Sequence, residues 1–183
     1  MGRSFFVQPE TMRLNLADVH RRAIEELIAT NPKKLSQKDL DKEIESLDAK
    51  AQAIEGNYIE VKKRLTVGEQ RHIFARMVRD FRPGEQPTLD PTQVGISKVI
   101  EYLTAWGGPG FVDEDGRAVK FPKPIASTFK DRESLLSQLH GDVYNDISAA
   151  IDWHETEQAR EWSEEKNGTD GAKSSAAISP SVV

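Results

Sequence analysis

The segment from Tyr58 to Glu69 reads YIEVKKRLTVGE and leads from a strand pattern directly into a helix start. Its first half alternates apolar and polar residues, which is typical of a half-buried strand. Thr66 and Glu69 have the spacing of a capping box, in which the Thr side chain accepts a backbone N–H and the Glu side chain reaches back. The segment therefore predicts a strand over 58–65 and a helix that follows it at once and buries Ile73, Phe74, Met77 and Val78.

Upstream, Met12 to Leu16 carries a second alternating pattern, and the simplest topology pairs it with the 58–65 strand. Two helical patterns lie between these strands. Asp18 is the predicted cap of the first, which ends at Asn31-Pro32 because a residue before proline is pushed away from helical geometry. Ser36 is the predicted cap of the second, whose apolar residues step by four and three as in a short coiled-coil seam: Leu40, Ile44, Leu47, Ala51 and Ile54. We expect an antiparallel helical hairpin over 17–56, inserted between the two strands.

Downstream, the pattern predicts a helix that starts near Pro91, ends at Trp106 and buries that ring, with Asp90 as its cap. The acidic run Asp113–Gly116 predicts a tight turn between two short strands, Phe111–Val112 and Ala118–Phe121. A last helical pattern carries Val143, Ile147, Ala150 and Ile151, and the chain becomes rich in Gly and Ser from Asn167.

These patterns together predict a mainly helical α+β fold, with small antiparallel β-sheet elements, packed helices and the inserted hairpin. We expect a flexible arm over 1–10, a single domain over 11–166 and a disordered tail over 167–183.

Composition argues against several classes of function. The 183 residues include no cysteine, which excludes disulfides and thiolate metal sites. No apolar run approaches the roughly 20 residues that a membrane-spanning helix needs. The four histidines are scattered without metal-ligand spacing, and no nucleophile motif occurs. We therefore expect a soluble protein that is not an enzyme, with no metal, no cofactor and no membrane partner.

Charge is unevenly distributed along the chain, whose net charge is −5. Residues 62–82 include seven basic and two acidic residues, whereas residues 131–165 include ten acidic and two basic ones. Overall acidity argues against a nucleic-acid partner, so we expect the basic segment and exposed tryptophans of the acidic segment to contact protein. The predicted partner-binding residues are Lys62, Arg64, Arg71, Arg76, Arg79, Trp153 and Trp162.

The order of these elements resembles the tail assembly chaperones of siphovirus-type, long-tailed bacteriophages. The resemblance rests on the strand-to-helix junction Val61–Glu69, a helix ending at Trp106, the acidic glycine turn before Val119-Lys120-Phe121, and a final helix with Ile147 and Ile151. It covers roughly residues 58–153. The inserted helical hairpin and the run Gly107–Gly110 depart from the family's compact pattern.

The resemblance implies a non-enzymatic protein of the bacterial host cytoplasm that is absent from the mature virion. Such proteins bind the tape measure protein and help the tail tube protein to assemble around it; a homo-oligomer is also consistent with this role. The family often makes a longer product by ribosomal frameshifting, and Glu165-Lys166-Asn167 is compatible with a slippery sequence. Two alternatives stay open: a structural or connector protein of the virion, and a small nucleic-acid-associated regulator that uses the Lys62–Arg82 segment.

Overall fold

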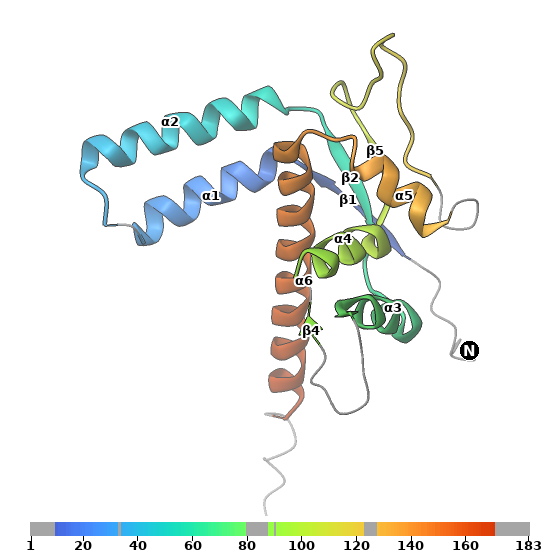
Figure 1. Ribbon diagram of the computed structural model, residues 1–183. Coiled ribbons are helices and arrows are strands. Elements are labelled where there is room, and N and C mark those ends of the chain that lie inside the picture. Colours follow the sequence, from blue (N-terminus) through green and yellow to red (C-terminus); the bar gives the residue numbers. More distant parts are fainter. Residues whose placement is uncertain (1–9, 33, 80–87, 90, 123–127, 171–183) are drawn as a thin grey trace, which may run out of the picture. The chain divides into compact units, whose positions relative to one another are not determined.

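The two strands expected on either side of the hairpin insertion pair with one another in a three-stranded sheet (Figure 1). The computed structural model describes residues 10–32, 34–79, 88–89, 91–122 and 128–170. In chain order the elements are β1 (Thr11–Asn15), α1 (Ala17–Thr30), α2 (Gln37–Ala53), β2 (Tyr58–Lys62), α3 (Val67–Met77), β3 (Val78–Arg79), β4 (Thr88–Leu89), α4 (Pro91–Tyr102), β5 (Leu103–Gly107), α5 (Phe129–Leu136) and α6 (Gly141–Asp170). The predicted mainly helical α+β fold is confirmed.

The chain divides into two compact units, Met1–Ile151 and Asp152–Val183. The first holds the sheet, helices α1 to α5 and the beginning of α6. The described part of the second is the continuation of α6 to Asp170, which is three residues beyond the predicted start of the tail at Asn167. The predicted arm, apart from Glu10, and residues 171–183 of the predicted tail lie outside the described residues, as does the predicted cap Asp90.

The sheet has the order β1-β2-β5, and all its pairs are antiparallel. Thr11 pairs with Lys62 and Asn15 with Tyr58, which confirms the predicted pairing of the two strands that flank the hairpin. The central strand supplies two fully buried side chains, Ile59 and Val61. Strand β2 ends at Lys62, however, so the prediction that it continues to Leu65 is wrong.

The third strand corrects the prediction of a helix that ends at Trp106. Helix α4 stops at Tyr102, and Leu103–Gly107 forms β5 against β2. The register shifts opposite Glu60 and Val61 because β5 holds one extra residue, Thr104, whose hydroxyl donates to the Glu60 carbonyl at 2.9 Å. A bulge of this kind lets Leu103 and Trp106, three positions apart, both be buried, and this spacing imitates a helical stripe.

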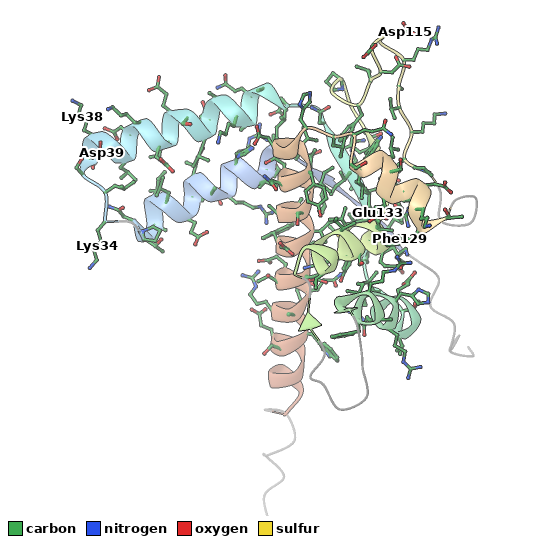
Figure 2. All side chains as sticks on the ribbon, in the orientation of Figure 1. Lys34, Lys38, Asp39, Asp115, Phe129 and Glu133 are labelled. Atoms are coloured by element: carbon green, nitrogen blue, oxygen red, sulfur yellow. The ribbon has the colours of Figure 1, made fainter. Side chains whose placement is uncertain are left out.

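Helices α1 and α2 pack side by side as the predicted hairpin (Figure 1). Ser36 caps α2 as expected and accepts the Asp39 N–H at 3.3 Å. Asp18 does not cap α1, because the helix begins at Ala17 and Leu16 is its N-cap residue; Asp18 lies in the first turn and accepts from Arg21 at 3.0 Å. In Figure 2, Lys34, Lys38 and Asp39 mark the end of the hairpin where the chain turns from α1 into α2.

The loop after β5 is closed by three aromatic rings. Trp106 stacks on Phe111 with ring centroids 4.9 Å apart, and Phe121 lies 4.8 Å from Trp106. The predicted Asp115-Gly116 turn is present, and Figure 2 places Asp115 at the tip of this loop. The two predicted short strands reduce to a single bridge between Val112 and Ala118.

Candidate partner-binding surface

Helix α3 is anchored at its start by the predicted capping box. The Glu69 N–H donates to the Thr66 hydroxyl at 3.3 Å, and the Glu69 carboxylate accepts the Thr66 N–H at 2.7 Å. The same carboxylate accepts from the Lys62 ammonium at 2.6 Å. Burial raises the pKa of Glu69, but the bonds from Lys62 and Thr66 outweigh it and lower the pKa below its usual value. The ion pair thus joins the end of β2 to the first turn of α3.

This pairing corrects the role expected for Lys62. Its side chain is 7% exposed and lies against Glu69, so it is part of the fold and not of an accessible basic surface. Arg64 is exposed but follows the end of β2, so it does not lie on a strand face with Lys62.

The remaining basic residues are dispersed. Arg71 is exposed on α3. The Arg76 guanidinium lies 3.2 Å from the ring centroid of Phe129, which projects from α5 (Figure 2). Arg79 lies in β3, and its side chain is outside the described atoms. Of the five basic residues predicted to bind a partner, Arg64 and Arg71 are exposed side chains in the described part of the chain.

An exposed stripe on α3 joins Arg71 to two apolar side chains. Val67 is 66% exposed and Phe74 is 64% exposed. The positions Val67, Arg71 and Phe74 are spaced by four and three residues, so they lie above one another on one helix face. A different face of α3 packs on α4. Ile73, which is next to Phe74 in sequence, is half-buried. We call Val67, Arg71 and Phe74 the α3 stripe.

Phe74 was expected in the core, and that prediction is wrong. Successive residues on a helix are about 100° apart, so one packed face cannot bury Ile73 and Phe74 equally. Val67 was not predicted as a functional residue. The spacing of Val67, Arg71 and Phe74 was the signal that could have identified the stripe.

The two predicted tryptophans belong to the second unit and differ in exposure. Trp153 is half-buried, which corrects its prediction as an exposed anchor. Trp162 is 62% exposed. Glu155 and Ala159 precede it by seven and three residues and share its face of α6.

In the described ranges, no group of three or more His, Cys, Asp or Glu side chains could hold a metal ion. None of the helices described is long and apolar enough to cross a membrane. Comparison of the chain with protein-family models, curated proteins and solved structures finds no match. The α3 stripe is therefore the candidate site within the first unit.

Proposed function

We propose that this protein is a tail assembly chaperone of a siphovirus-type bacteriophage, which binds the tape measure protein and assists assembly of the tail tube. The proposal assigns it no enzymatic activity. The single observation that supports it best is the α3 stripe, where two large apolar side chains are exposed on either side of an arginine. The order of elements along the sequence supplies the link to this family.

The spacing of the α3 stripe is suited to binding a helix of the tape measure protein, the client of the proposed chaperone. Its two apolar side chains are seven residues apart, or about 10 Å along the helix axis. An amphipathic helix presents anchors at the same repeat, so it can lie along such a face. Arg71, between the two anchors, favours a client helix with an acidic residue at its centre.

Co-expression with the tape measure protein of the same genome tests this function. We expect the two proteins to co-purify and the client to stay soluble. Phe74→Asp should lower the recovered client about tenfold, because it places a charge in the apolar contact. The matched control is Ile28→Asp on α1, whose parent side chain is similarly exposed at 61% and should leave recovery unchanged.

The outcomes separate the alternatives. If the tape measure protein does not bind the unaltered chain, the chaperone proposal is wrong; if it binds both variants equally, the α3 stripe is not its site. As a chaperone of the host cytoplasm, the protein should also be missing from purified virions by mass spectrometry. Stoichiometric amounts in virions would favour the structural or connector alternative.

The proposed function carries a prediction about the gene. Codons GAA AAA AAC for Glu165-Lys166-Asn167 would contain the slippery heptamer A AAA AAC. We expect ribosomes to slip by −1 near Lys166 and to make a minor, longer product that shares residues 1–166. The slip would fall within α6, four residues before its last residue Asp170. The prediction is wrong if the gene has other codons at Lys166-Asn167 and no overlapping −1 reading frame that continues beyond Val183.

A further inference from the structure

The start of β1 lies close to the start of α3. The Lys63 N–H donates to the Glu10 carbonyl at 2.7 Å, and the Lys63 ammonium lies 3.0 Å from the Glu10 carboxylate. Because β1 and β2 are antiparallel, the start of β1 is at the end of β2 that leads into α3 (Figure 1). Lys63 precedes Val67, the first residue of the α3 stripe, by four residues. Glu10 therefore attaches the N-terminal residues to the first unit next to this stripe.

The residues before Glu10 include a short apolar run, Phe5-Phe6-Val7. Arg3 is the one charged side chain among residues 1–9. An extended chain spans at most about 3.3–3.6 Å per residue, so Phe6 can be as far as about 13 Å from Glu10. This reach is comparable with the length of the stripe, about 10 Å along the helix axis. The apolar run is thus long enough to reach the stripe with the sheet unchanged.

The chemistry of the stripe is suited to phenylalanine rings. Val67 and Phe74 expose apolar surface, and Arg71 lies between them. An arginine guanidinium is attracted to the face of an aromatic ring. This chain makes such contacts elsewhere: the Arg13 guanidinium lies 3.3 Å from the ring centroid of Tyr58, and that of Arg76 lies 3.2 Å from the ring centroid of Phe129.

We propose that Phe5-Phe6-Val7 docks on the α3 stripe of the same molecule and covers it. The contacts of Glu10 with Lys63 favour this occupant, because they place its attachment point next to α3 within the first unit. A short tether gives an effective concentration in the millimolar range, which a second copy of the chain would have to supply from solution. The proposal revises the expectation of a flexible arm over residues 1–10.

This contact does not depend on the proposed function, because both of its sides belong to one chain. It adds a regulatory step to that function, since a client helix has to displace the N-terminal run from the stripe. The run would cover the exposed apolar side chains until a client binds. Phe5→Ser combined with Phe6→Ser should therefore raise the recovery of the tape measure protein about threefold, because the stripe is then always open to the client.

An engineered disulfide in the full chain tests the contact directly, because the chain has no cysteine of its own. Ser4→Cys is combined with Gln70→Cys, which is exposed on the face of α3 that carries Val67 and Phe74. The matched control combines Ser4→Cys with His72→Cys, which is exposed on another face of the same helix. Under mild oxidation of protein at about 1 µM, we expect the first pair to form an intramolecular cross-link about tenfold faster than the second. Mass spectrometry identifies the cross-linked peptides.

Adding Phe5→Ser and Phe6→Ser should lower the rate of the Gln70 pair to that of the control pair, and Trp162→Ala should leave the preference unchanged. Three results would overturn the inference. Equal rates for the two pairs would mean that the run does not dock on the stripe, and a preference that appears only with Trp162→Ala would mean that the second unit covers it. A cross-link between two molecules would assign the stripe to a second copy. No client is present, so this result and the test of the proposed function can fail independently.

Discussion

Replacing Trp106 with alanine is expected to lower the free energy of unfolding by about 3–5 kcal/mol, the usual range for deleting a large buried aromatic side chain. The ring is 6% exposed and lies between Phe111 and Phe121. Its Nε1–H donates to the Val119 carbonyl at 2.7 Å, so the substitution also leaves that oxygen without its donor. Urea unfolding followed by circular dichroism measures the difference.

Trp162→Ala is the matched control for this loss, since it removes the same side chain from an exposed position. It should change stability by no more than about 0.5 kcal/mol. A loss below about 1 kcal/mol for Trp106→Ala would mean that this ring does not hold the loop to the sheet.

Local chemistry explains why much of the fold could be predicted from sequence. Ser36, Thr66 and the pair Asn31-Pro32 act within a few residues of themselves, and each marks a helix end where it was expected. The alternating patterns of β1 and β2 identified both strands and their pairing, because each strand buries one face. These features need no knowledge of distant parts of the chain.

The wrong predictions concern residues whose structure depends on a partner that is distant in the sequence. The apolar spacing of Leu103 and Trp106 is helical, and only the pairing of β5 with β2 and the bulge at Thr104 turn it into strand structure. Periodicity alone does not separate these cases for a short apolar run. The buried Arg132, whose guanidinium donates to the Leu103 carbonyl, was likewise not identified because its acceptor is 29 residues away.

Only part of the candidate surface could be predicted from the sequence, because the burial of some of its residues depends on partners elsewhere in the fold. Arg64, Arg71 and Trp162 are exposed as expected, since charge and position near a helix end favour exposure. Lys62 was misplaced because its burial depends on how the bend at Lys63 and Arg64 brings it to Glu69. Phe74 was misplaced because the face of α3 that packs on α4 cannot be known until α4 is in place.

The largest effect of a single small substitution is expected at Gly108. Its φ is +122°, and an added Cβ would lie 2.6 Å from the Asn57 Cα and from the Gly56 carbonyl oxygen. Asn57 cannot readily move, because its carbonyl accepts the Leu16 N–H at 3.0 Å and its side chain accepts the Gly110 N–H at 2.7 Å. Backbone strain and overpacking each cost about 1–3 kcal/mol, so Gly108→Ala should lower the free energy of unfolding by about 3 kcal/mol or more.

Gly116→Ala separates the two contributions. Gly116 also has a positive φ, +76°, but nothing lies within 4 Å of an added Cβ. Only the backbone strain of a left-handed residue then applies, and we expect a loss of about 1 kcal/mol in the same urea titration. Equal losses for the two variants would mean that backbone conformation, and not the close approach to Asn57, is what requires glycine at position 108. A larger loss at Gly108 assigns the difference to the contact that holds the end of β5 against the start of β2.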